Sequence, residues 1–171
     1  MKSIYLFLGA GLISGLAGCT TPVVLAPVGP DPSGFENPSA SGQLEVYSGL
    51  AMQSDNQNQG SHDSVWYQHT DYAIYDLQGK MVRDVGNTIG HYEEAPRCMV
   101  LPAGKYVVQA QANDYLQVRV PVTIERGRTT TVHLDDNWNM PAGVPATALV
   151  SLPNGQAVGW RASSTNANGL N

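Results

Sequence analysis

The chain has 171 residues and a formal net charge of −5, from nine basic and fourteen acidic side chains. This length is enough for one domain with a buried core. Because the sequence has no basic stripe that could neutralise phosphates, nucleic acid is excluded as an expected partner. Composition leaves the other function classes open.

The first eighteen residues have the zones of a signal peptide. Met1–Ser3 carries one positive charge, and Ile4–Leu16 is apolar apart from glycines and one serine. An apolar stretch of about 7–15 residues is too short to cross a hydrocarbon core, which needs roughly 20 residues. We therefore predict a cleaved signal peptide over residues 1–18.

The residues that close this segment are Leu16, Ala17, Gly18 and Cys19. This run resembles the lipobox of bacterial lipoproteins, in which small residues precede a cysteine. The resemblance implies a signal-cleavage motif at the first three positions, with diacylglycerol and an N-acyl chain attached covalently to Cys19. Two or three acyl chains hold a protein firmly at a membrane, and no other cofactor is expected. The alternative is an ordinary secretory signal with a chance cysteine.

The same resemblance predicts a location. Thr20 follows the cysteine, where an aspartate would favour retention at the inner membrane in lipoproteins of enteric type. We expect a lipid-anchored protein of the cell envelope at the outer membrane, on its periplasmic face or at the cell surface, if the source is Gram-negative. Removal of residues 1–18 would leave 153 residues with a net charge of −6.

Residues 19–42 are expected to form the lipidated cysteine and a proline-rich tether. Prolines recur along this stretch at Pro22, Pro27, Pro30, Pro32 and Pro38. Such segments populate extended polyproline II at about 3.1 Å per residue, so the tether could carry the domain up to about 70 Å from the bilayer.

From residue 43 the pattern is that of β-structure, with turn signals about every ten residues. The expected strands cover 43–52, 72–75, 81–85, 97–101, 105–112, 116–125 and 129–134, with an exposed loop over 54–64. We predict an all-β, antiparallel β-sandwich over residues 43–135. A C-terminal extension over 136–171 would contain a hairpin turning at Pro153–Gly155 and a frayed tail.

The clearest strand of this set is Leu116–Glu125, where apolar and polar residues alternate. One face carries Leu116, Val118, Val120, Val122 and Ile124. Pro121 lacks the N–H that a sheet needs, which suggests an edge strand or a bulge. In the next strand, alternation directs Val132 and Leu134 inward and His133 to solvent.

Several runs resemble carboxypeptidase-regulatory-like and collagen-adhesin B-type modules. They are Leu101–Tyr106 (LPAGKY), Asn113–Tyr115, Val118–Glu125 and Gly127–Leu134, with Tyr75–Lys80 upstream. The resemblance covers roughly residues 70–134 and implies a transthyretin-like or Ig-like sandwich. Such motifs specify turns and strands, so they carry almost no information about activity.

Residues with catalytic or metal-binding chemistry are few. His62 and His69 lie near Asp63 and Asp71, but their spacing matches no compact zinc motif and suits solvated loop histidines. The unpaired Cys98 lies in an apolar run and is expected to be buried.

The two carboxylate pairs, Glu93–Glu94 and Asp135–Asp136, are expected in surface turns, because neighbours on a strand point to opposite faces. The hydroxyisourate hydrolases of the transthyretin fold end in Tyr-Arg-Gly-Ser, whereas this chain has Trp160–Ser163 (WRAS). We therefore expect no catalytic residues and no enzyme activity.

Aromatic residues flank the polar loop, at Trp66, Tyr67 and Tyr72. The leading hypothesis is a membrane-anchored envelope lipoprotein with a non-catalytic binding or structural module, whose rim at these residues meets an envelope protein or a glycan. One alternative is a metal-binding or hydrolytic transthyretin-like protein that uses His62, His69 and nearby acids. Another is an accessory lipoprotein of a surface or secretion complex.

Overall fold

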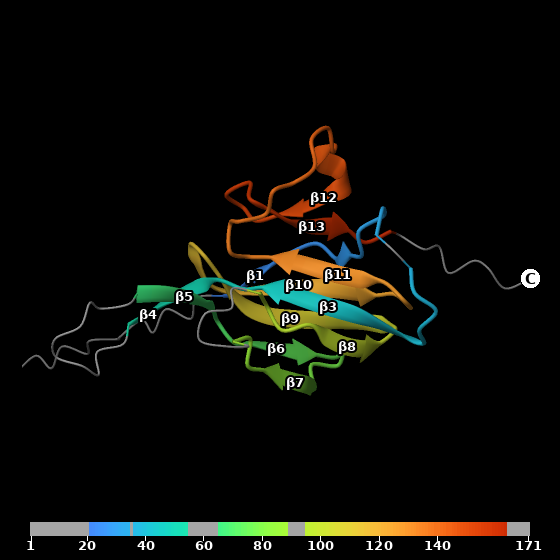
Figure 1. The fold of residues 1–171 in the computed structure, drawn as a ribbon, viewed down its shortest axis with the longest axis horizontal. Helices are drawn as coiled ribbons and strands as arrows, with labels where there is room; N and C mark the ends of the chain where they lie inside the picture. The colour runs from blue at the N-terminus through green and yellow to red at the C-terminus, as the bar shows by residue number, and fades with distance from the viewer. Residues whose placement is uncertain (1–20, 35, 55–64, 89–94, 164–171) are drawn as a thin grey trace, which may run out of the picture.

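A computed structural model describes residues 21–34, 36–54, 65–88 and 95–163 (Figure 1). These residues form thirteen strands and one short 3₁₀ turn, η1 (Ala146–Ala148). The strands are β1 (Val23–Val24), β2 (Val28–Gly29), β3 (Ser41–Tyr47), β4 (Leu50–Ser54), β5 (Val65–His69), β6 (Tyr72–Tyr75), β7 (Met81–Val85), β8 (Met99–Pro102), β9 (Gly104–Ala112), β10 (Tyr115–Ile124), β11 (Thr129–His133), β12 (Leu149–Ser151) and β13 (Ala157–Arg161).

The strands form three sheets. An eight-stranded sheet has the order β12-β13-β2-β10-β9-β6-β7, with β1 also paired to β10. A three-stranded sheet has the order β11-β3-β8, and β4 and β5 form a two-stranded ribbon. The prediction of an all-β sandwich is confirmed. Not every pair is antiparallel, however, because β11 runs parallel to β3, and β10 runs parallel to β1 and β2.

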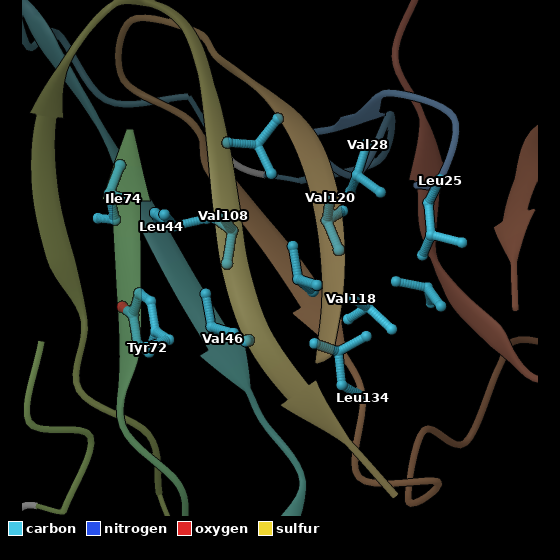
Figure 2. Packing of buried hydrophobic residues seen from close by; sticks show 14 of the residues in the cluster. Leu25, Val28, Leu44, Val46, Tyr72, Ile74, Val108, Val118, Val120 and Leu134 are labelled. Atoms are coloured by element: carbon cyan, nitrogen blue, oxygen red, sulfur yellow. The ribbon is translucent and has the colours of Figure 1, made fainter. Parts of the chain in front are cut away.

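The core lies between the two larger sheets and is almost entirely aliphatic. Alternation produces it directly: β3 and β11 bury every second residue, as does β10 from Val118 onward. Figure 2 shows inward side chains of β2, β3, β6, β9 and β10 meeting in one cluster. Its fully buried members include Val28, Leu44, Val46, Ile74, Val108, Val118, Val120 and Leu134.

The expected tether differs from the structure between residues 23 and 29. Val23 pairs with Val118 of β10, and Val28 pairs with Val122 and is fully buried. Leu25, between the two short strands, is 8% exposed. The prolines around this segment favour an extended tether, so its apolar residues were not predicted to belong to the core. The domain therefore begins before residue 43.

Pro121 lies in an interior strand, not at the edge that its missing N–H suggested. The carbonyl of Arg119 accepts a hydrogen bond of 2.9 Å from the N–H of Leu25, on the side of β10 that faces β1 and β2. Residues two apart on a strand direct their backbone groups to the same side, so the Pro121 nitrogen faces the interval between β1 and β2. The proline is accommodated because this interval interrupts the ladder.

The inward face predicted for residues 116–125 is confirmed from Val118 onward and wrong for Leu116. The register between β10 and β9 shifts between Tyr115 and Val118, and Leu116 is 79% exposed. An extra residue in a strand reverses the faces of the residues before it. One irregularity therefore transfers a leucine from the core to the surface.

The predicted C-terminal hairpin is present as β12 and β13, with Gly155 at a φ of +91° in its turn. It is not a separate extension, because Trp160 of β13 pairs with Gly29 of β2. A Cβ on Gly159 would lie 2.9 Å from the carbonyl oxygen of Thr131, so only glycine permits this approach of β13 to β11. Residues 149–161 therefore complete the main sandwich.

Candidate functional site

A hollow of about 410 Å³ lies where β3, β4 and β5 meet the segment after β11. Four segments distant in the sequence contribute to it. Its lining consists of Tyr47, Leu50, Tyr67, His69, Ala95, Asp135 and Asn137. Aromatic surface beside a few polar groups is the usual composition of a site that binds an organic ligand.

Tyr67 is the most accessible aromatic residue of this lining. It pairs with Met52 across the β4–β5 ribbon and is 57% exposed. Its neighbour Trp66 is half-buried, on the other side of β5. The Tyr67 ring can therefore stack on a flat or apolar ligand face while its hydroxyl remains able to hydrogen-bond.

His69 is held firmly beneath the hollow. It is only 7% exposed, and its Nδ1 lies 2.7 Å from the carbonyl oxygen of Ser48. The Ser48 hydroxyl donates to the carbonyl of Thr70 and accepts from the amide of the buried Asn87. The expectation of a solvated loop histidine is therefore wrong. Since Nδ1 is engaged by Ser48, Nε2 is the ring nitrogen left for a ligand.

Asp135 and Tyr47 also line the hollow. Asp135 is 4% exposed, and its carbonyl accepts a hydrogen bond of 2.7 Å from the side-chain amide of Asn113. This corrects the expected surface turn at Asp135. Burial raises the pKa of Tyr47, and Glu45 and Asp135 add to this effect, so the phenol keeps its proton and can donate to a ligand.

A row of five aromatic rings continues from the hollow along the outer side of the three-stranded sheet. Tyr47 meets His69 edge to face at 5.6 Å and stacks on His133 at 4.7 Å. His133 in turn stacks on Trp138 at 4.8 Å, and Trp138 meets Trp160 edge to face at 6.1 Å. We call these residues the ring row; offset and edge-to-face contacts of this kind stabilise aromatic clusters.

His133 points to the outer side of its strand as predicted, but Trp138 and Tyr47 cover it. Burial lowers the pKa of His133 to about 4, although the nearby Asp135 opposes this shift. The imidazole is therefore neutral at pH 7, when it stacks between its two neighbours. The predicted side of the strand is therefore correct, but the predicted exposure of His133 to solvent is wrong.

The predicted rim of Trp66, Tyr67 and Tyr72 is only partly assembled. Tyr67 lines the hollow, whereas Tyr72 is 3% exposed and points into the core with Ile74. Burial is the main cause of a raised pKa at Tyr72. Tyr72 is therefore a core residue, because the short strand β6 faces the sandwich with its first and third positions.

Several other predicted residues lie outside the described ranges. They include the cleavage motif and Cys19, the histidine at position 62, residues 55–64 of the polar loop, and the acidic pair at 93–94. Within the described ranges, no group of three or more His, Cys, Asp or Glu side chains could hold a metal ion. Asp71, which the metal alternative groups with His69, accepts a hydrogen bond from the backbone N–H of Asn87.

Cys98 is exposed and unpaired, which corrects the expected burial. It lies one residue before β8, outside the alternation that would have directed it inward. Partial burial, followed by the charge of Glu45, raises the pKa of the Cys98 thiol. This microenvironment disfavours the thiolate that nucleophilic chemistry requires.

Five residues of the lining were not singled out from the sequence as binding residues: Tyr47, Leu50, Ala95, Asp135 and Asn137. A local signal existed for Tyr47 alone. It follows Leu44 and Val46 at the outward position of an alternating strand, where a large aromatic residue is unusual unless something covers or binds it.

Comparisons with protein-family models, with curated proteins and with solved structures gave no match. Among the residues described by the structure, none of the helical segments has the length and hydropathy of a membrane span.

Proposed function

We propose that this chain is a membrane-anchored lipoprotein of the cell envelope whose non-catalytic β-sandwich binds a protein or a glycan. The anchor is supported by the signal-peptide zones and by the run Leu16–Cys19, which resembles a lipobox. In this proposal Cys19 carries the acyl chains, and the outer membrane is the location favoured by Thr20. The all-β sandwich is compatible with the transthyretin-like or Ig-like module that the sequence resembles.

The observation that carries the binding role is the exposed Tyr67 at the edge of the hollow. Tyr67 is 57% exposed and lines the hollow together with His69, Tyr47 and the acidic Asp135. An aromatic face can stack on the apolar side of a sugar ring or on a planar side chain, while carboxylate, amide and imidazole groups accept or donate hydrogen bonds. The hollow therefore combines stacking with directional polar contacts.

The anchor is tested by metabolic labelling with a fatty acid and by mass spectrometry of the N-terminal peptide. We expect an acylated Cys19 in the wild type, and complete loss of label with release from the membrane in Cys19→Ser. An unmodified cysteine, or release of the wild-type protein into the medium, would contradict the anchor.

The binding site is tested with Tyr67→Ala and, as a control, Tyr75→Ala on β6. Partner capture is measured by crosslinking in intact cells and by binding to purified envelope glycans. We expect at least a tenfold loss for Tyr67→Ala and no loss for Tyr75→Ala, because stacking on one aromatic ring typically dominates such sites. Equal capture by both variants would argue against the hollow, and tight stoichiometric metal in the purified protein would favour the metal-binding alternative.

A further inference from the structure

We infer that the end of the sandwich formed by the start of β1 and the turn between β9 and β10 rests on the lipid bilayer. Leu116 is the side chain that would enter the boundary between water and lipid. The inference depends on the proposed anchor at Cys19, and it adds to that anchor an orientation of the folded domain.

The link between Cys19 and the folded domain is short. Val23 already belongs to β1, where it pairs with Val118. Four residue steps separate Val23 from Cys19, and an extended chain spans at most about 3.6 Å per residue, or about 14 Å in all. The polar layer of one leaflet is roughly 5–8 Å thick. A domain held by so short a link lies against the membrane and cannot stand off from it.

An exposed apolar side chain lies at this end of the sandwich. β1 runs parallel to β10, with Val24 beside Arg119. Because the two strands are parallel, the chain that leaves β1 from Val23 towards Thr21 runs in the same direction as β10 from Val118 towards Leu116. Leu116 is 79% exposed, the largest value among the exposed large apolar side chains of the described residues. Leu116 therefore lies in the direction in which the chain leaves the sandwich towards its anchor.

The same end of the molecule carries further apolar surface. The backbone N–H of Leu50, at the start of β4, donates to the side chain of Asn113 in the turn between β9 and β10. This contact fixes the ribbon of β4 and β5, which projects from the left end of the sandwich in Figure 1. Val24 is 66% exposed and Met52 on β4 is 65% exposed. Apolar side chains at a membrane-proximal end favour insertion into the interface.

Charge at this end identifies the kind of lipid surface. The exposed Asp114 lies in the turn itself, and Arg119 is on β10. Asp135, followed by the exposed Asp136, adjoins the turn, because its carbonyl accepts a hydrogen bond from the Asn113 side chain. Acidic side chains outnumber the basic one here, so this end has no net attraction to anionic headgroups. Contact through Leu116 should therefore occur on electroneutral lipid, with the acyl anchor supplying the high local concentration.

The orientation also bears on the hollow. Leu50 and Tyr67, which line it, belong to the ribbon of β4 and β5. This ribbon is joined to the turn between β9 and β10 by the hydrogen bond from the Leu50 N–H to the Asn113 side chain. A ligand in the hollow would consequently be held beside the bilayer and not far above it.

The test uses the full mature chain, residues 19–171, coupled through the Cys19 thiol to a maleimide lipid in phosphatidylcholine vesicles. Cys98→Ser is included in all variants, because the exposed Cys98 thiol would otherwise react. Leu116→Trp reports contact, and Leu77→Trp is the matched control, since Leu77 is 62% exposed in the distant turn between β6 and β7. Brominated phosphatidylcholine quenches tryptophan that reaches the acyl region.

We expect brominated lipid to remove at least half of the added fluorescence of Leu116→Trp and less than a tenth of that of Leu77→Trp. Equal quenching of both, or none at Leu116→Trp, would overturn the orientation. Hydrogen exchange of the tethered protein with Leu116 intact provides a second measurement. It should be slowed in residues 113–117 and unchanged in residues 77–82, and the absence of slowing in residues 113–117 would also overturn the inference.

Because the coupling to lipid is chemical, this test does not depend on acylation in cells. A failure here rejects the orientation and leaves the anchor standing. An unmodified Cys19 in cells would reject the anchor, whatever the vesicles show.

Discussion

The two faces of the three-stranded sheet have opposite chemistry. Its inner face carries Leu44, Val46 and Val132, which are fully buried, whereas its outer side carries Tyr47 and His133 in the ring row. Val46 pairs with Val132, and the next pair along the same two strands is Tyr47 with His133. A single residue step thus separates the core from the candidate site. Substitutions on the inner face should change stability, and those on the outer face should change binding.

The largest effect is expected at Val28 of β2, which belongs to the same core cluster as the inner face of the three-stranded sheet and lies in the segment for which the sequence predicts a tether. Val28→Asp places an unpaired charge in the core and should reduce the free energy of unfolding by more than about 4 kcal/mol. Val24→Asp, four residues earlier and 66% exposed, should change it by about 0.5 kcal/mol or less. Urea unfolding of the mature chain measures both. Similar values for the two variants would show that this segment does not belong to the core.

A smaller effect is expected within the three-stranded sheet itself. Leu44→Ala removes a fully buried side chain of β3 and should cost about 2–5 kcal/mol, from lost burial and the cavity left behind. Val100→Ala on β8 is the matched control, since Val100 is 62% exposed, and it should cost about 0.5 kcal/mol. Thermal unfolding distinguishes the two. A large loss at Val100 would mean that another surface covers the outer face of β8.

The smallest effect is a pH dependence at His133. Its pKa of about 4 in the folded protein lies below the ordinary value of 6.5, because burial disfavours the imidazolium. The unfolded chain therefore binds more protons between these values, so folding stability falls as the pH drops from about 6.5 to 4. The ring is partly exposed, and we expect a loss of about 1–2 kcal/mol.

The control for this prediction is His133→Phe, which keeps a ring in the stack but cannot be protonated. Between pH 7 and pH 4 the unfolding free energy of the wild type should fall by more than that of this variant. A difference that stays constant over this range would assign the acid sensitivity to other groups.

Much of the fold could be predicted because its signals are local. Asp76–Lys80 forms the predicted turn between β6 and β7, with Gly79 at a φ of +82°. Alternation correctly directed Val118, Val120 and the following apolar residues of β10 inward. The same rule failed at Leu116, where the register shift between β9 and β10 depends on the partner strand and leaves no mark in the spacing.

The candidate site could be predicted only in part. Tyr67 was recognised as an aromatic residue beside a polar loop, but Tyr47 and Asp135 reach the hollow from β3 and from the segment after β11. His69 was placed in solvent because its neighbours are polar, whereas it is buried by its contact with the Ser48 carbonyl, across 21 residues. Periodicity describes neighbours along one strand and cannot report such contacts.

By itself, the sequence determined the strand-rich class, most strand positions and turns, and the features on which the proposed anchor at Cys19 depends. Each of these follows from composition, alternation or a short motif, which act over a few residues. Only the tertiary structure decided that residues 23–29 and the C-terminal hairpin join one sheet, and that Tyr47, Tyr67 and His69 share one hollow. The physical reason is that backbone pairing and aliphatic burial between distant segments select their neighbours by register and shape, and many apolar sequences satisfy these requirements equally well.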